Sequence, residues 1–116
     1  MAEVKRTPRR GDVFWVSLDP ALGSEIKKTR PAVILSNNSC NAYGSRVVVL
    51  PLTSNVDSLY PGEALITFKG RSARVLGDQI RSLDKSRLRT RIETLSADEM
   101  AAVEEAVRIT LGLRPW

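Results

Sequence analysis

Short segments rich in β-branched residues recur through the first 95 residues, and turn-forming residues separate them. The pattern predicts strands at 12–18, 31–36, 46–52, 63–68, 72–83 and 89–95. In the first segment, Phe14, Val16 and Leu18 alternate with other residues and therefore share one face of their strand. A chain of this kind is expected to fold mainly as an antiparallel β structure.

Turn residues set the expected connections between these strands. Lys69-Gly70 predicts a hairpin turn, and Gly77 is expected to mark a bulge in the second arm of that hairpin. Residues 37–45 are expected to form a turn, and 84–88 a short helical turn. Pro31 is expected to begin its strand, because a proline at the centre of a strand removes a ladder hydrogen bond.

One amphipathic helix is predicted at the end of the chain. Ser96 and Glu99 form a capping-box pattern, and Leu95 is placed to pack against Met100 as a hydrophobic staple. Gly112 suits the C-terminal stop of this helix. The expected apolar stripe consists of Met100, Val103, Val107 and Leu111. Residues 1–9 are expected to form a flexible basic leader, and residues 10–116 a single domain in which this helix packs on a small barrel.

Missing residue types restrict the possible chemistry. The chain has no histidine, which excludes Ser-His, Cys-His and paired-histidine catalysis within it, and Cys40 is its one cysteine, as is common in a reducing compartment. Zinc sites of clustered Cys and His are excluded for the same reason. No apolar run approaches the roughly 20 residues of a membrane span, and the N-terminal sequence lacks the apolar stretch of a secretory signal. A cytoplasmic protein without a membrane partner is expected.

Positive charge is concentrated in the predicted barrel. Residues 1–91 contain 16 Lys and Arg against 8 Asp and Glu, whereas residues 92–116 contain 2 against 5, and the whole chain carries +5. Thirteen of the eighteen cations are arginine, whose planar guanidinium suits bidentate contacts to phosphates and bases. This distribution favours a nucleic-acid partner, although a merely solubilising surface charge would give a similar composition.

Three groups of segments, taken in order, resemble the MazF/PemK toxin family. They are 10–16 with 18–20, then 23–25 with 28–36, and finally 51–54 with 78–88. The resemblance implies a small SH3-like (CcdB/MazF-type) antiparallel barrel with a C-terminal amphipathic helix, assembled as a homodimer. It also implies a metal-independent endoribonuclease without a cofactor, which cuts single-stranded RNA by attack of the adjacent 2′-hydroxyl. The products would be a 2′,3′-cyclic phosphate and a 5′-hydroxyl, and translation would be inhibited. A cognate antitoxin is the implied protein partner, and DNA would be involved only indirectly.

Arg30 and Thr53 occupy the positions that carry catalysis in this family. An arginine can hold two phosphate oxygens of a transition state, and a threonine can donate its hydroxyl to a phosphate oxygen. A guanidinium is a poor general base, because its pKa lies far above neutral pH, although nearby cations could lower the pKa, and Lys27, Lys28 and Arg81 are candidates for that role. Glu25 is therefore our candidate to orient or deprotonate the 2′-hydroxyl, although it could equally form a surface ion pair.

Further residues in the matching segments are candidate RNA contacts. They are Ser24, Lys28, Ser54, Asp78, Gln79 and Arg81. Asp78 and Gln79 could instead form an ordinary polar surface, and Trp15 and Phe14 are expected to lie in the core or in a dimer contact rather than to stack on bases. Two other functions remain open: a non-catalytic gyrase-binding toxin of the CcdB kind, and a plain RNA-binding module.

Overall fold

The computed structural model describes residues 7–18 and 29–114. The strands in this part of the chain are β1 (Asp12–Ser17), β2 (Thr29–Ile34), β3 (Arg46–Thr53), β4 (Glu63–Phe68), β5 (Arg71–Leu76), β6 (Arg81–Asp84) and β7 (Leu88–Thr94). The helices are α1 (Asn38–Tyr43) and α2 (Ala97–Thr110), together with the short 3-10 helices η1 (Gly77–Gln79) and η2 (Lys85–Arg87).

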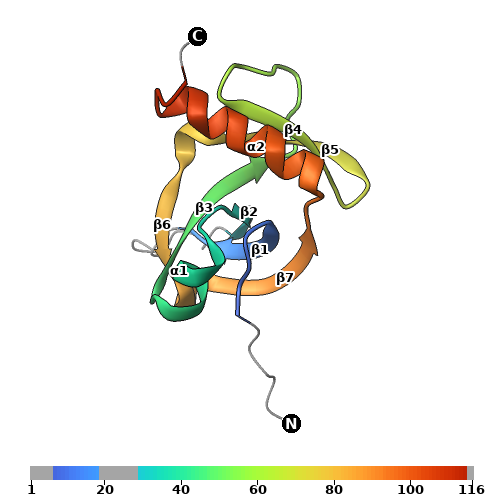
Figure 1. Ribbon diagram of the computed structural model, residues 1–116. Coiled ribbons are helices and arrows are strands. Elements are labelled where there is room, and N and C mark those ends of the chain that lie inside the picture. Colours follow the sequence, from blue (N-terminus) through green and yellow to red (C-terminus); the bar gives the residue numbers. More distant parts are fainter. Residues whose placement is uncertain (1–6, 19–28, 115–116) are drawn as a thin grey trace, which may run out of the picture.

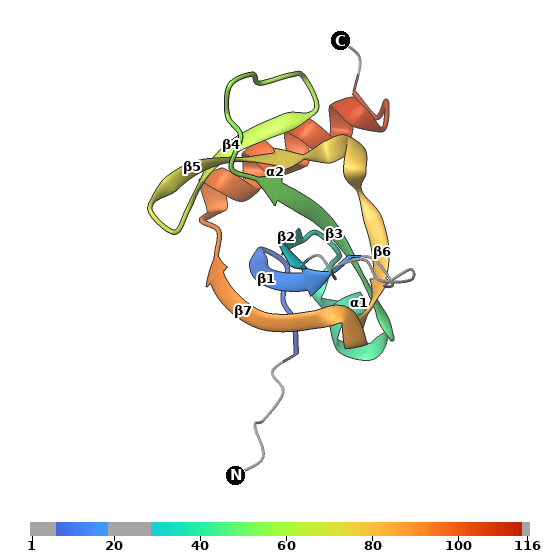
Figure 2. The same cartoon turned by 180° about the vertical axis from the view of Figure 1, so that it is seen from behind.

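The seven strands form one antiparallel sheet that curls into a half-barrel. The pairing order is β4-β5-β3-β2-β1-β7, and β6 pairs with the first half of β3. The views from the front and from behind show β6 and β7 curving around β1, while α2 lies across β4 and β5 (Figures 1 and 2). The prediction of a mainly β fold with one C-terminal amphipathic helix is confirmed.

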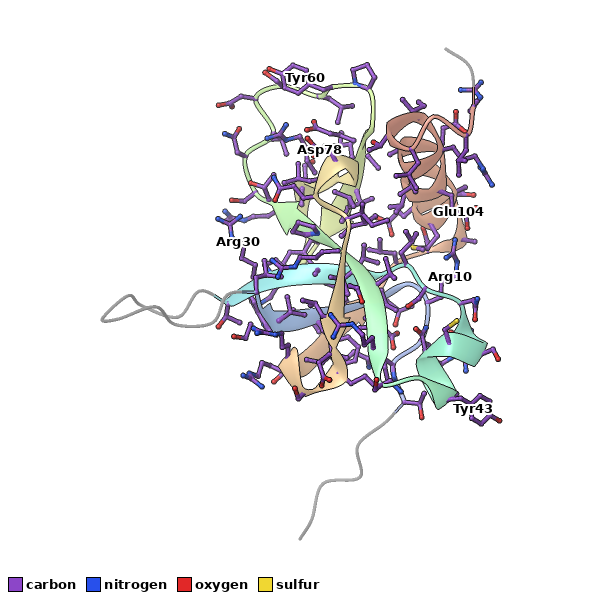
Figure 3. The ribbon with its side chains drawn as sticks, turned by 90° about the vertical axis from the view of Figure 1, so that its left-hand side faces the viewer. Arg10, Arg30, Tyr43, Tyr60, Asp78 and Glu104 are labelled. Carbon is purple, nitrogen blue, oxygen red and sulfur yellow. The ribbon has the colours of Figure 1, made fainter. Side chains whose placement is uncertain are left out.

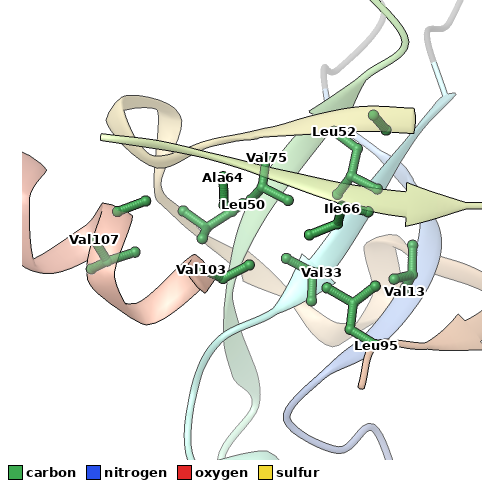
Figure 4. Packing of buried hydrophobic residues seen from close by; sticks show 12 residues of the cluster. Val13, Val33, Leu50, Leu52, Ala64, Ile66, Val75, Leu95, Val103 and Val107 are labelled. Carbon is green, nitrogen blue, oxygen red and sulfur yellow. The ribbon is translucent and has the colours of Figure 1, made fainter. Parts of the chain in front are cut away.

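Each face of the curled sheet carries its own hydrophobic core. Figure 4 shows the core beneath α2, where Leu50 and Val75 of the sheet pack with Val103 and Val107 of the helix. The opposite face buries a second cluster: Phe14, Val16, Leu18, Ala32, Ile34, Val47, Val49 and Leu83. The expected shared face of Phe14, Val16 and Leu18 is thus confirmed, since a strand sends alternate side chains to opposite faces.

The capping signals at the start of α2 are confirmed. The Ser96 hydroxyl accepts a hydrogen bond from the Glu99 backbone N–H, and the Glu99 carboxylate accepts one from the Ser96 N–H. Gly112, with φ of +71°, follows the helix as predicted. The apolar stripe was wrong at its end, because Leu111 remains 49% exposed, whereas Ala106 is buried. In residues 7–18 and 29–114, no helix has the length and apolar character needed to cross a membrane.

Two local predictions were wrong because the sequence signals have more than one structural solution. The polar segment after β2 forms the helix α1 instead of a turn: the Asn37 side chain caps it by accepting from the Cys40 N–H at 2.8 Å. Asn41 is fully buried, and its amide donates to the Ser36 carbonyl oxygen, which satisfies this buried polar group. Pro31 does not begin β2, which starts at Thr29. It lies opposite Trp15 of β1, beyond the last residue that β2 pairs with β3.

The predicted long arm 72–83 is broken into β5 and β6 by η1. The break is at Gly77, whose backbone N–H donates to the Gly62 carbonyl oxygen at 3.0 Å. A Cβ atom at Gly77 would lie 2.3 Å from that oxygen, so only glycine permits the approach. Gly77 therefore ends the strand instead of marking a bulge within it. The expected helical turn near 84–88 is present as η2.

Candidate functional site

A cleft of about 640 Å³ opens where β2 begins and β3 ends. Its lining residues come from β1, β2, β3 and the hairpin of β4 and β5: Trp15, Arg30, Pro31, Leu52, Thr53, Ser54, Phe68, Lys69, Arg71, Ser72 and Ala73. Figure 3 shows Arg30 at one edge of the molecule, with Arg10 and Glu104 at the opposite edge. Three sequence-predicted site residues, Arg30, Thr53 and Ser54, meet in this cleft.

The pairing of β2 with β3 leads Arg30 and Thr53 to the same cleft. Ala32 of β2 lies opposite Pro51 of β3. Ala32 and Pro51 are the last pair of this ladder, and Arg30 and Thr53 each lie two residues beyond it, where both line the cleft. The Arg30 side chain is exposed and that of Thr53 is half-buried. The scaffold thus presents a guanidinium and a hydroxyl to one ligand.

Hydrogen bonds fix the orientation of Thr53. Its side-chain oxygen accepts from the Asn55 backbone N–H at 3.2 Å, so the hydroxyl hydrogen is available to a ligand. Arg74, which lies opposite Thr53 on β5, holds the same loop residue: its Nε donates to the Asn55 carbonyl oxygen at 2.6 Å. Arg74 is anchored in turn, because its Nη1 lies 2.8 Å from Oε1 of Glu63.

The Arg74–Glu63 pair is largely shielded from water. The two side chains are only 13% and 11% exposed. Glu63 Oε1 also accepts from the Tyr60 backbone N–H at 3.0 Å, which ties down the far part of the same loop. A shielded ion pair with additional hydrogen bonds is more rigid than a surface pair. Arg74 and Glu63 are therefore positioning residues for Thr53, and sequence reasoning missed both.

The floor of the cleft is apolar and aromatic. Leu52 and Ala73 belong to the core beneath α2, and Phe68 packs against it. Trp15 and Phe68 meet edge to face, with ring centroids 6.4 Å apart and an angle of 78° between the rings. Phe14 is in the core as expected, but Trp15 lines the cleft, because neighbouring residues of a strand point to opposite faces.

The rims of the cleft are cationic. Arg30 lies on one strand end, and the hairpin contributes Lys69 and Arg71, whereas no lining residue carries a carboxylate. Ion pairs among the described residues engage other arginines: Arg10, Arg74, Arg91, Arg108 and Arg114. Within that same set, the side chains of the three cleft cations form no ion pair, although the Lys69 backbone N–H donates to the Glu93 carboxylate at 3.1 Å. Among the described residues, these three side chains are therefore available to an anionic ligand.

The other predicted site residues are placed differently. Asp78 and Gln79 lie in η1, and Arg81 lies on β6 opposite Val49 of β3. All three residues are exposed and are not part of the cleft lining. Ser24, Glu25 and Lys28 fall outside the described residues. Sequence reasoning missed Trp15, Phe68, Lys69, Arg71 and Ser72. Strand alternation could have indicated Trp15, and the Lys69-Gly70 turn is where the hairpin residues join the cleft.

The described residues offer no cluster of three or more His, Cys, Asp or Glu side chains that could hold a metal ion. The cleft can bind an anion through guanidinium, ammonium and hydroxyl groups, and a flat apolar group through its floor. This pairing of chemistries matches a nucleotide unit.

Comparison with known proteins identifies the family. Residues 9–111 match the family described as the PemK-like, MazF-like toxin of type II toxin-antitoxin systems. The chain belongs to this toxin family. It is 39% identical over 114 residues to the endoribonuclease MazF9 of Mycobacterium tuberculosis, an alignment covering 90% of this chain and 97% of that protein.

Solved structures of MazF-type toxins have the same fold. A MazE–MazF structure from Deinococcus radiodurans is 31% identical, with a TM-score of 0.81 over 95% of this chain and 100% of that chain. A mycobacterial endoribonuclease in complex with its cognate antitoxin is 26% identical, with a TM-score of 0.73 over 97% and 99%. The half-barrel with one C-terminal helix is thus the fold of this MazF/PemK chain.

Proposed function

We propose that this MazF/PemK toxin is an endoribonuclease that cleaves single-stranded RNA at short sequence motifs without a metal ion and thereby inhibits translation. The observation that carries the proposal is the shared cleft of Arg30 and Thr53, with cationic rims and no lining carboxylate. The 39% identity to a protein named as an endoribonuclease over nearly the whole chain supports the same activity.

The proposed reaction is attack by the 2′-hydroxyl oxygen on the neighbouring phosphorus. A P–O2′ bond forms and the P–O5′ bond breaks, which leaves a 2′,3′-cyclic phosphate and a 5′-hydroxyl. One proton must leave the 2′-oxygen and one must reach the departing 5′-oxygen. Arg30 stabilises the added negative charge on the phosphoryl oxygens and donates a hydrogen bond to the leaving 5′-oxygen, which assists its protonation by a water molecule. Thr53 donates its hydroxyl to a phosphoryl oxygen.

We assign Glu25 to orient the attacking 2′-hydroxyl and accept its proton. A carboxylate suits this step better than Arg30, because a guanidinium rarely loses its proton. Ser24, Lys28, Ser54, Asp78, Gln79 and Arg81 are proposed to contact further parts of the RNA. Glu25→Gln should reduce cleavage strongly; full activity in Glu25→Gln, together with near-complete loss in Arg30→Lys, would refute the role of Glu25.

We further propose a homodimer that acts in the cytoplasm, where its RNA substrate lies, and that a cognate antitoxin blocks the RNA site. Two solved structures with the same fold contain an antitoxin or MazE together with the toxin, which supports a protein inhibitor as partner. The basic residues 1–9 are proposed to act as a leader to a single toxin domain at 10–116.

The decisive experiment is digestion of a long single-stranded RNA by protein treated with a chelator. We expect discrete fragments with 2′,3′-cyclic phosphate and 5′-hydroxyl ends. Arg30→Lys and Thr53→Val should each lower kcat by about 100-fold or more, because each removes transition-state stabilisation. Arg108→Lys and Thr90→Val change the same residue types outside the cleft and should retain activity. Binding without cleavage would indicate an RNA-binding module. If the RNA is neither bound nor cleaved, a protein target would be indicated.

A further inference from the structure

We propose that the aromatic floor of the cleft is a nucleobase subsite. In this arrangement one base, from a nucleotide adjoining the scissile phosphate, leaves its stack and lies against Trp15 and Phe68. The inference rests on the proposed function, because it assigns substrate contacts within the same cleft as Arg30 and Thr53.

The geometry of the two rings suits a flat ligand. Trp15 and Phe68 are both half-buried and are held nearly perpendicular to one another, at 78°. A planar base can stack on the face of one ring while its edge meets the other ring, and on Trp15 it would take the place of the Lys69 ammonium that lies over the ring. Such stacking is sequence-tolerant, because every base has a π face.

The size and polarity of the cleft are also appropriate. Its volume of about 640 Å³ is within the roughly 300–1,000 Å³ of small-ligand sites. Pro31, Leu52 and Ala73 extend the apolar floor, whereas Ser54 and Ser72 place hydroxyls on the lining that can bond the polar edge of a base. A base on this floor would therefore be desolvated on its faces and hydrogen-bonded at its edge.

Two cations of the β4–β5 hairpin line the cleft beside the aromatic floor and can pair with the phosphate of that nucleotide. Lys69 occupies the hairpin turn with φ of +52°, and its Nζ lies 5.9 Å from the centroid of the Trp15 ring. Arg71 lines the cleft from the next strand. Arg30 lies near the start of β2, so cations line the cleft both from β2 and from the β4–β5 hairpin. Bases flanked by phosphates match this pattern, whereas an apolar protein segment would leave these charges unpaired.

Fluorescence of Trp15 tests the subsite directly. Trp116→Phe leaves Trp15 as the only tryptophan. This variant is titrated with randomised eight-residue 2′-O-methyl RNA, in which the attacking hydroxyl is blocked, and with an abasic 2′-O-methyl backbone of equal length. We expect saturable quenching by the base-bearing RNA and little by the abasic polymer. Equal responses to the two probes, or no response to either, would overturn the subsite.

Kinetics provide a second test that also separates this inference from the proposed function. Trp15→Leu should raise KM for RNA by at least about 5-fold, because the base loses its stacking platform. The control Tyr43→Leu removes a 90% exposed aromatic on α1 and should leave KM unchanged. An unchanged KM in Trp15→Leu would overturn the subsite while cleavage persists. Absence of cleavage in the unaltered protein would refute the proposed function, and the fluorescence titration would still decide whether the base binds.

Discussion

Replacing Arg74 by methionine should damage both stability and catalysis. The substitution removes a guanidinium that pairs with Glu63 at 2.8 Å, in a site where the side chains are 13% and 11% exposed. It also removes the donor to the Asn55 carbonyl oxygen, which is held at 2.6 Å. Glu63 would then remain shielded without its cation, although its contact with the Tyr60 N–H persists.

The magnitude follows from the shielding of this pair. Removing one partner of a buried ion pair costs about 3–5 kcal/mol, whereas an exposed pair contributes about 0–1 kcal/mol. We therefore expect the free energy of unfolding to fall by about 3 kcal/mol in Arg74→Met. The double variant Glu63→Gln/Arg74→Met should lose less than Arg74→Met alone, because no unpaired charge remains.

Urea unfolding of the four proteins of this double-mutant cycle measures the coupling, and RNA cleavage below the transition measures the effect on Thr53. A loosened Thr53 should lower kcat about 10- to 100-fold in folded Arg74→Met. A loss of stability below about 1 kcal/mol would show that the pair behaves as a surface pair. Unchanged kcat in the folded variant would refute the positioning role of Arg74.

Three further predictions test separate parts of the fold and the cleft. The pKa of Glu99 is lowered chiefly by the Ser96 backbone N–H and then by that of Thr67, so its stabilisation is complete above the usual value of 4.5 and is lost as the pH falls through the lower folded value. Acid unfolding of Glu99→Gln should accordingly show a shallower pH dependence than the unaltered protein; equal slopes would refute this account. Gly77→Ala should reduce the free energy of unfolding by about 2–3 kcal/mol, because its Cβ would lie 2.3 Å from the Gly62 oxygen. Gly70→Ala, whose Cβ meets no atom within 4 Å, should lose only about 1 kcal/mol from its φ of +79°; the reverse order in thermal unfolding would contradict the close approach of Gly77 and Gly62. Lys69→Gln and Arg71→Gln should each reduce the slope of log binding constant against log salt concentration by about 0.7 for single-stranded RNA, whereas Arg114→Gln, which lies outside the cleft, should not; a common slope in all variants would exclude phosphate contacts by the hairpin.

Local sequence signals predicted the elements that local physics determines. The capping box defined the start of α2, and the Lys69-Gly70 turn defined the β4–β5 hairpin, because both depend on residues close in the chain. The polar segment that forms α1 was misjudged although its contacts are local, because asparagine-rich segments favour turns as well as helix caps. The break at Gly77 depends instead on the remote Gly62, which no local signal indicates.

The candidate site was only partly predictable. Family resemblance pointed to Arg30 and Thr53, which lie two residues beyond the last β2–β3 pair and line the same cleft. The aromatic floor joins Trp15 to Phe68 across a long stretch of chain, and no periodicity specifies which distant strands become neighbours. The hairpin register places Arg74 opposite Leu65, one diagonal step from Glu63, but the link to Asn55 depends on the path of a loop.

The most direct test of the catalytic assignment is a crystal structure of the protein with an uncleavable 2′-O-methyl RNA that carries its cleavage motif. We expect the scissile phosphate to lie within hydrogen-bond distance of both the Arg30 guanidinium and the Thr53 hydroxyl. A scissile phosphate bound elsewhere, with neither group in contact, would contradict the assignment.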